Sequence, residues 1–253
     1  MNNFTVIKLK IIVVPFLLPC LLLIIWLIVS NFFVINQFYL PKVSQVVDII
    51  FSFNYLTDFG ETLYRTCVGF LIAAFFGIIC GIFIGLNKKL FHLLEGTIEF
   101  FRALPATALI PLFLLFFGIG DFAKIAISVF VCFWIIQINT IYGVWSIHHL
   151  TLKIGKIYNI SRYKLIKEII IPAALPQIST GLRISISLSL IVIVVTEMFI
   201  GTKFGLGQKI YDSYITYRIA DLYAYTIIVG LLGYVLNKLF NAIETRIIHW
   251  SGK

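Results

Sequence analysis

The residue whose position most directly implies chemistry is an acid within an apolar stretch. Glu197 stands in VIVVTEMFIG, near the end of a segment long enough to enter a membrane. An ionisable group at such a place marks a substrate path, a gate or a partner across a helix interface. The alternative is a position at the headgroup level, where Glu197 meets water or a cation of an outer loop. The sequence leaves these alternatives open.

Three further residues are candidates for a path or gate. Pro105 and Pro111 interrupt RALPATALIPLFLLFFGIGD, and each removes a backbone donor. Broken helices at membrane depth are tolerated where they pack on protein or line a cavity, so a kinked structural helix and a pore-lining helix both fit. Asn139 lies in another apolar segment, where a hydrogen bond between helices explains it equally well.

A basic stretch between Leu150 and Pro176 reads LTLKIGKIYNISRYKLIKEIIIPAALP. Each charge at the bilayer centre costs about 2.5–3.5 kcal/mol on insertion scales, so this stretch is predicted to lie outside the hydrocarbon. Ser161 fits the N-cap of a helix running to about Ile171, after which Pro172 and Pro176 are expected to turn the chain back to the membrane. The predicted helix has an apolar face formed by Leu165, Ile166, Ile169 and Ile170. Docking to another protein and binding to a lipid surface both fit this pattern.

Motifs for nucleotide binding and catalysis are missing from the sequence. The nearest approach to a P-loop, GTKFGLGQK, has Leu206 where the second glycine is required. No H-E-x-x-H, G-x-S-x-G or C-x-x-C pattern occurs, and no Cys/His cluster indicates a metal. We therefore predict no catalytic residue, no metal site and no cofactor bound by this chain, which is not expected to be an enzyme.

Composition places the chain in a membrane. Of its 253 residues 60% are hydrophobic and only 12% are charged, and the mean hydropathy is +1.03. A soluble domain is about a quarter charged, so the fold class expected is an all-α integral membrane protein with a single transmembrane domain over residues 1–253. The net charge of +9 is interpreted as basic loops facing an anionic leaflet rather than as a nucleic-acid surface.

Six segments are apolar and long enough to span a bilayer. They are residues 11–33, 62–86, 98–118, 122–145, 180–200 and 222–245, with a cytoplasmic loop over 146–179. With both termini in the cytoplasm, fourteen of the twenty Lys and Arg residues fall on the inner side. This distribution follows the positive-inside rule and predicts that orientation. Pro41 and the valines after it predict a short amphipathic helix on the outer surface.

Small residues recur at every fourth position of two predicted spans. Such spacing forms a groove along one helix face, which permits close backbone contact in lipid. Tight packing and a sliding surface between gating helices both fit this pattern. The residues are Gly69, Ala73, Gly77, Gly81 and Gly85 in the second span, and Gly181, Ser185 and Ser189 in the fifth.

Four stretches in this order resemble the permease subunits of bacterial ABC importers, in the nitrate/sulfonate/taurine branch of the binding-protein-dependent family. They are LPKVSQVVDII, FRALPATALIPLFLLFFGIGDFAKI, SRYKLIKEIIIPAALPQISTGLRISIS and TEMFIGTKFGLGQKI. The resemblance extends from about Leu40 to Trp250. It implies a type I ABC importer permease fold with a cytoplasmic coupling helix, in the cytoplasmic membrane of a bacterium.

The resemblance also implies which residues couple to an ATPase. By position these are Lys153, Gly155, Asn159, Ser161, Arg162, Leu165 and Pro172. The family's loop opens with Glu-Ala-Ala, where this chain has Lys153, Ile154 and Gly155, and Asn159 stands where the family has a glycine. The later half, from Ser161 to Pro176, fits the family pattern.

The machine implied by the resemblance has several partners. They are a cytoplasmic ABC ATPase that binds ATP and Mg, a second permease subunit in a homodimer, an external solute-binding protein and the lipid bilayer. The solute expected from the branch is a sulfonate, nitrate or another small solute. Two other classes remain as alternatives: a self-sufficient channel or secondary carrier, and a non-transporting assembly subunit that kept the fold.

Overall fold

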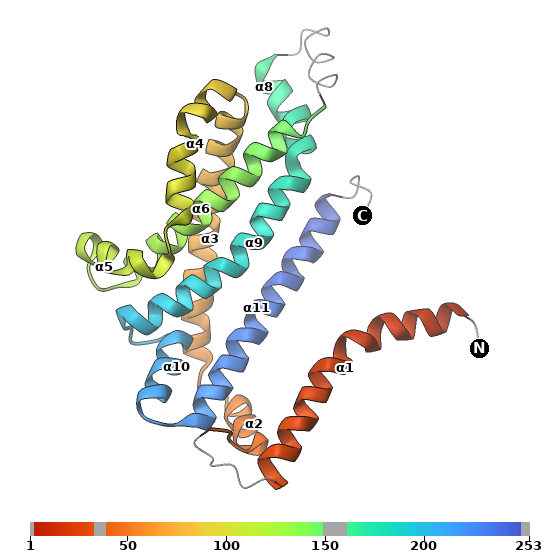
Figure 1. Cartoon of the computed structure of the whole chain (residues 1–253), viewed down its shortest axis with the longest axis vertical. Helices are drawn as coiled ribbons and strands as arrows, with labels where there is room; N and C mark the ends of the chain where they lie inside the picture. The colour runs from red at the N-terminus through yellow and green to blue at the C-terminus, as the bar shows by residue number, and fades with distance from the viewer. Residues whose placement is uncertain (1–2, 33–38, 149–160, 249–253) are drawn as a thin grey trace. The chain divides into compact units, whose positions relative to one another are not determined.

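The computed structural model describes residues 3–32, 39–148 and 161–248, and every regular element in these ranges is helical (Figure 1). The chain forms two compact units, residues 1–55 with 209–228 and residues 56–208 with 229–253. The helices are α1 (Asn3–Phe32), α2 (Val43–Phe51), α3 (Leu56–Gly85), α4 (Lys88–Ala103), α5 (Ala106–Phe117), α6 (Asp121–Trp145), α8 (Arg162–Lys164), η1 (Leu165–Ile170), α9 (Ile171–Ile200), α10 (Leu206–Ile215) and α11 (Ile219–Ile247).

The smaller unit is held by aromatic side chains. Trp26 of α1 donates its indole N–H to the Pro41 carbonyl at 3.1 Å, and its ring lies 5.6 Å from that of Tyr223. The Tyr223 hydroxyl donates to the Tyr39 carbonyl at 2.9 Å. Helix α2 buries Val46 and exposes Val47 and Phe51, as expected for the amphipathic helix predicted after Pro41.

The larger unit is built on α3, α6 and α9, which pack against one another along their lengths (Figure 1). Their shared core contains Ala73, Cys132 and Ile136, each fully buried. Helix α4 packs on α3 and α6 in a second cluster, with Phe91 and Ile98 against Ile141, and the Phe101 ring stacks on Trp134 with centroids 5.1 Å apart. Trp145 donates its indole N–H to the Gly85 carbonyl at 2.9 Å, which fixes the end of α6 to the end of α3.

By length and composition, the described residues contain four helices able to cross a membrane, or five spans if one bent helix pair counts as a span. The four are α3, α6, α11 and the continuous helix Leu165–Ile200. Helices α3, α6 and α11 occupy the second, fourth and sixth predicted spans, and α1 covers the first.

The third predicted span, 98–118, differs from a single crossing helix. Helices α4 and α5 meet at a 95° bend. Pro105 causes the break, because a proline disfavours helical geometry in the residue before it. Leu104 accordingly adopts an extended conformation with ψ 123°, and Pro105 is the N-cap of α5. Pro111 lies inside α5 without ending it.

The predicted turn at Pro172 and Pro176 is wrong, and the fifth helix starts well before residue 180. A π-helical turn, η1, precedes α9, and Ile171 donates its backbone N–H to Ile166, five residues back. The α-helical pattern restarts at Ile171, so Pro172 lies in the first turn of α9, where a missing N–H breaks no helical bond. Pro176 lies within α9, and the helix continues to Ile200.

Candidate functional sites

Glu197 lies at the centre of a buried polar cluster that joins α3, α6 and α9. Its side chain is fully buried, and one carboxylate oxygen accepts from the Arg65 guanidinium at 2.6 Å. The Thr62 hydroxyl donates to the same carboxylate at 2.9 Å. Arg65 also donates to Asp121 at 2.8 Å, and Lys124 lies 3.4 Å from that acid. We call Asp58, Thr62, Arg65, Asp121, Lys124 and Glu197 the Arg65 cluster.

The Arg65 cluster also accepts hydrogen bonds from backbone N–H groups at the start of α10. Three consecutive backbone N–H groups donate to its side chains: Gly205 to Asp58, Leu206 to the Thr62 hydroxyl and Gly207 to Glu197, each at 2.9 Å. These are groups that a helix start leaves without helical partners. A Cβ on Gly205 would lie 2.6 Å from the carboxyl carbon of Glu197, so only glycine permits this approach. The cluster therefore fixes the turn after α9 onto α3.

This geometry gives Glu197 the interface partner that the sequence left as one of its alternatives. Removing one member of a buried, hydrogen-bonded ion pair is strongly destabilising, because the remaining charge stays buried. Both oxygens of Glu197 already have donors from the protein. The arrangement can hold three helices and a turn in one position.

Sequence reasoning did not single out Arg65, Asp58, Thr62, Asp121 and Lys124 as site residues. A signal was present, because Asp58, Thr62 and Arg65 follow one another at intervals of four and three, which places them on one helix face. Asp121 and Lys124 are likewise three residues apart at the start of an apolar helix. The pairing of Arg65 with an acid 132 residues away was not readable from either spacing.

Asn139 lies at the packed interface of α6 with α9. Its amide donates to the Ile135 carbonyl at 2.8 Å and accepts from Gln177 at 3.4 Å. A Cβ on Gly181 would lie 2.6 Å from the Cβ of Asn139, so the two helices approach closely here. These contacts correspond to the interhelical hydrogen bond that was the alternative for Asn139. Ser185 of α9 is also buried, and its carbonyl accepts from Cys132 of α6 at 3.3 Å.

The small residues of α3 all face α6. Gly69, Ala73, Gly77, Gly81 and Gly85 are buried. A Cβ on Gly81 would lie 2.5 Å from the Thr140 Cβ, and one on Gly77 would lie 3.0 Å from Ile136. At both positions a larger side chain would clash with α6, so glycine permits the close approach of the two helices.

The basic segment, defined here as Ser161–Ile170, presents two different faces. Ser161 caps it, since its hydroxyl accepts the Lys164 backbone N–H at 3.5 Å. Leu165, Ile166 and Ile170 pack in a core cluster with Val144 of α6 and Ile82 of α3. The opposite face is exposed and carries Tyr163, Lys164, Lys167 and Glu168. Among the residues predicted to couple to an ATPase, Lys153, Gly155 and Asn159 lie outside the described residues; Arg162 begins α8, and Pro172 lies in α9.

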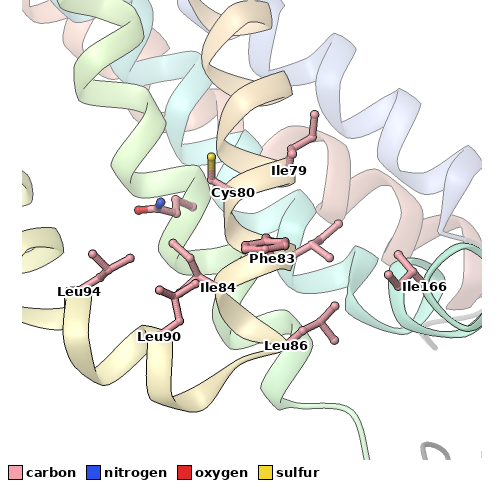
Figure 2. A pocket seen from close by; sticks show the side chains of 10 residues that line it. Ile79, Cys80, Phe83, Ile84, Leu86, Leu90, Leu94 and Ile166 are labelled. Atoms are coloured by element: carbon pink, nitrogen blue, oxygen red, sulfur yellow. The ribbon is translucent and has the colours of Figure 1, made fainter. Parts of the chain in front are cut away.

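An apolar pocket adjoins the basic segment. Its volume is about 590 Å³, and it lies between α3, α4, α6 and η1. Figure 2 shows Leu94 and Ile166 at opposite sides of it, with Phe83 of α3 between them. The lining residues are Ile79, Cys80, Ile82, Phe83, Ile84, Leu86, Leu90, Leu94, Gln137 and Ile166.

Comparisons with known proteins identify the family of the chain. Residues 73–249 match the family described as binding-protein-dependent transport system inner membrane component. The chain is 28% identical to the putative aliphatic sulfonates transport permease SsuC of Bacillus subtilis, over 92% of this chain and 86% of that protein. It is 34% identical to the nitrate import permease NrtB of Leptolyngbya laminosa, over 75% of this chain and 67% of that protein.

The fold is similar to that of a solved transporter. A chain of the inward-facing MetNI methionine ABC transporter superposes with a TM-score of 0.69 at 18% identity, covering 78% of this chain and 97% of that one. At this identity the likeness establishes the fold alone.

Proposed function

The chain belongs to the family of binding-protein-dependent transport system inner membrane components, and on this premise we propose how it is coupled to the rest of an importer. It is a multi-pass inner membrane protein and a transmembrane subunit of an ABC importer. The basic segment is its docking surface for a cytoplasmic ABC ATPase, which binds and hydrolyses ATP with Mg. Its further partners are an external solute-binding protein and a second copy of this chain.

The observation that carries the docking proposal is the division of the basic segment into two faces. Its exposed face offers two lysines, one acid and the Tyr163 ring, which is 72% exposed. Its apolar face packs directly on α3, α6 and α9. A push on the exposed face is therefore transmitted to the spans through side chains in van der Waals contact rather than through a flexible tether. The two states of such a machine must differ in their affinity for ATP or for the binding protein, because otherwise nothing is coupled.

The proposed orientation places the basic segment and both termini in the cytoplasm. Support comes from the distribution of Lys and Arg, of which fourteen of twenty then lie inside. The Arg65 cluster then lies toward the outer side, where it fixes the turn between α9 and α10.

The proposed solute is a small molecule with an oxoanion group. The two relatives above are named for aliphatic sulfonates and for nitrate, and both solutes carry such a group. Uptake of labelled sulfonate and nitrate by cells with and without this chain tests the proposal. Loss of uptake of either solute on deletion supports it, and unchanged uptake of both contradicts it.

Docking is tested by purifying the chain from its native membrane in mild detergent and identifying the proteins bound to it. A P-loop ATPase in equal amount is expected. The double substitution Lys164→Glu/Lys167→Glu should release that ATPase, because it reverses two charges on the exposed face. The matched control Lys42→Glu/Lys203→Glu reverses two exposed charges on the proposed outer side and should retain the ATPase.

The outcomes also separate the other classes of protein. An intact preparation without any ATPase, from cells that still accumulate solute, would indicate a self-sufficient channel or carrier. An ATPase bound equally by both double variants would place docking away from the exposed face of the basic segment. Bound ATPase with unchanged solute uptake after deletion of the chain would indicate an assembly subunit.

A further inference from the structure

Helix α4 carries a line of exposed ionisable side chains along one side. They recur at intervals of four and three residues, so at about 100° per residue they fall within about 80° of the helix circumference. On the neighbouring side of the helix, Phe91 and Ile98 are buried in a core cluster with α3 and α6. We call the exposed side chains the α4 polar stripe: Lys88, His92, Glu95, Glu99 and Arg102.

The α4 polar stripe extends to the middle of α6, which is long and apolar enough to cross a membrane. Near the end of α6, the centroid of the Phe91 ring lies 4.6 Å from that of Trp145. Further along α4, the centroid of the Phe101 ring lies 5.1 Å from that of Trp134, which precedes Trp145 by about 16 Å of helix. Arg102 follows Phe101 directly, so it is level with the middle of α6.

A third side of α4 is exposed and apolar. Leu93 is 77% exposed and Phe100 is 61% exposed, and both lie about 120–140° around the helix from Lys88. This side suits lipid, whereas the polar stripe does not, because each charge at the bilayer centre costs about 2.5–3.5 kcal/mol. Ionisable residues at such depth face a bundle interior or a water-filled cavity. Since the stripe is exposed on this chain, we expect it to face water.

Arg102 is the deepest residue of the stripe and is not neutralised by this chain. Its guanidinium forms no ion pair or hydrogen bond with any residue in the described ranges, whereas Glu95 lies 3.5 Å from His92. The planar guanidinium matches oxoanion groups, to which it donates two parallel hydrogen bonds. The two acids of the stripe disfavour an anion beside them, so the Arg102 end is the position at which the stripe can hold one.

We propose that the α4 polar stripe lines a water-filled path from the Lys88 end of α4 to the middle of the bundle, where Arg102 binds an oxoanion. The 95° bend between α4 and α5 follows Arg102 within a few residues. Non-helical backbone at membrane depth is tolerated where it lines such a cavity. That the oxoanion is the transported solute rests on the proposed function, whereas water access and anion binding do not.

Water access is tested by labelling two neighbouring positions of the full-length protein in native membrane vesicles, with reagent on both sides. The background replaces every cysteine except the fully buried Cys132 with serine. Glu99→Cys is compared with the matched control Phe100→Cys, since both residues are exposed at nearly the same depth but on different sides of α4. Charged methanethiosulfonates react with a thiolate in water, so labelling at position 99 should be faster by about tenfold or more.

Equal rates at the two positions would overturn the proposal. Equally slow labelling would mean that the stripe is covered by lipid or by a second copy of the chain. Equally fast labelling would mean that α4 lies in water at the membrane surface.

Anion binding is tested in the same Glu99→Cys variant, because position 99 is one helical turn from Arg102. The anionic reagent, 2-sulfonatoethyl methanethiosulfonate, is itself an alkyl sulfonate, and its trimethylammonium counterpart carries the opposite charge. Arg102→Gln should lower the ratio of the anionic to the cationic rate by about tenfold, because it removes the nearby positive charge. The control Lys42→Gln removes an exposed lysine of the smaller unit and should leave the ratio unchanged.

Binding, as distinct from attraction, is tested by protection. Nitrate and ethanesulfonate should slow labelling at position 99 saturably, relative to chloride at the same ionic strength. Arg102→Gln should abolish this protection, and Arg102→Lys should keep only part of it, because lysine lacks the planar fork. Protection that persists in Arg102→Gln, or that is absent from the unmodified site, would overturn the assignment of Arg102. Neither labelling experiment uses ATP or a bound ATPase, so a failure here is distinct from a failure of the docking or uptake tests.

Discussion

Two helix interfaces within the larger unit are built in opposite ways. Between α3 and α6, a line of small residues brings the backbones together, and a Cβ added at Gly81 would meet Thr140. Between α9 and α11, side chains bridge a gap at two places, where Ser187 bonds Asn237 and Arg183 pairs with Glu244. Cavities of about 330 and 160 Å³ lie between the same two helices.

The difference between the two interfaces indicates which helices move together. Lipid is as apolar as a leucine side chain, so helices in a membrane are held by close packing and by hydrogen bonds. Helices α3 and α6 have many close contacts and are locked further by Arg65, which binds Asp121 of α6 and Glu197 of α9. Helix α11 is joined to α9 by a few polar pairs beside two cavities. We expect α3, α6 and α9 to move as one body and the α9–α11 interface to be the one that changes.

The largest expected loss of stability follows removal of the ion pairs that Arg65 forms across the first interface. Arg65→Met leaves Glu197 buried without its cation and should destabilise the protein by about 3–5 kcal/mol. The measurement is thermal unfolding of the purified permease in detergent. The double variant Arg65→Met/Glu197→Gln should recover part of the loss, because no unpaired buried charge remains at Glu197. A double variant less stable than the single one would show that Glu197 is not held mainly by Arg65.

A smaller loss of stability is expected from one methyl group added to the small-residue face of α3. Gly81→Ala places a Cβ 2.5 Å from the Thr140 Cβ and 2.8 Å from the Gln137 carbonyl oxygen. Overpacking of this kind costs about 1–3 kcal/mol, and the same unfolding measurement should report it. Restoring space with Thr140→Gly in the same chain should relieve the clash partly. Unchanged stability of Gly81→Ala would mean that α3 and α6 are free to separate.

Breaking the charged pair of the second interface should cost about the same or less. Arg183→Met leaves Glu244, which is 8% exposed, without its guanidinium partner. Hydrogen bonds to charged groups contribute about 1.5–3 kcal/mol, and the partial exposure of Arg183 reduces this figure. A spin-label distance between α9 and α11 should broaden in Arg183→Met while a distance between α3 and α6 stays narrow. Broadening of both would remove the contrast between the interfaces.

The uncharged pair should contribute less. Ser187 and Asn237 bond each other at 2.8 Å, and Asn237 also bonds the Gly233 carbonyl at 2.9 Å. Such bonds between membrane helices average about 0.6 kcal/mol in double-mutant cycles. A cycle of Ser187→Ala and Asn237→Leu, read by unfolding free energy, should give a coupling of that size. A coupling above about 2 kcal/mol would make this pair a lock comparable to Arg65.

The smallest effect is expected where the second interface has room. Gly230 lines the cavity of about 330 Å³, and a Cβ there meets nothing within 4 Å. Gly230→Ala should stabilise the protein by about 0.5 kcal/mol, because alanine is the better helix former. It is the matched control for Gly81→Ala, since the substitution is identical and only the packing differs. Equal destabilisation by both would show that the two interfaces are packed alike.

The sequence predicted what depends on local spacing. A small residue at every fourth position identified the face of α3 that packs on α6. Ser161 was predicted as an N-cap, and its hydroxyl accepts the backbone N–H of Lys164, three residues later. Charge predicted that the stretch between Leu150 and Pro176, with five cations, lies outside the hydrocarbon, and this stays a prediction. The first two patterns each lie within a single helix or turn.

What the sequence did not predict depends on chain segments far apart or on competition between local rules. The partner of Glu197 lies on another span, and the three N–H groups at the start of α10 are satisfied by α3 and α9. Pro172 was expected to end a helix, because the rule for prolines assumes a continuous α-helical pattern. The π-helical turn before it shifted the start of that pattern to Ile171, and the rule for a first-turn proline applied instead.

The π-helical turn Leu165–Ile170 affects the direction in which the exposed face of the basic segment points. A π turn accommodates one residue more than the α turn it replaces, and each residue of an α-helix advances the azimuth by about 100°. Removing one residue from this turn would convert it to α-helix and rotate Tyr163 and Lys164 by about that angle around the axis of α9. All side chains of the exposed face would remain, but they would point in another direction. The direction in which this surface points is therefore set by the number of residues between Ser161 and Pro172 as much as by their chemistry.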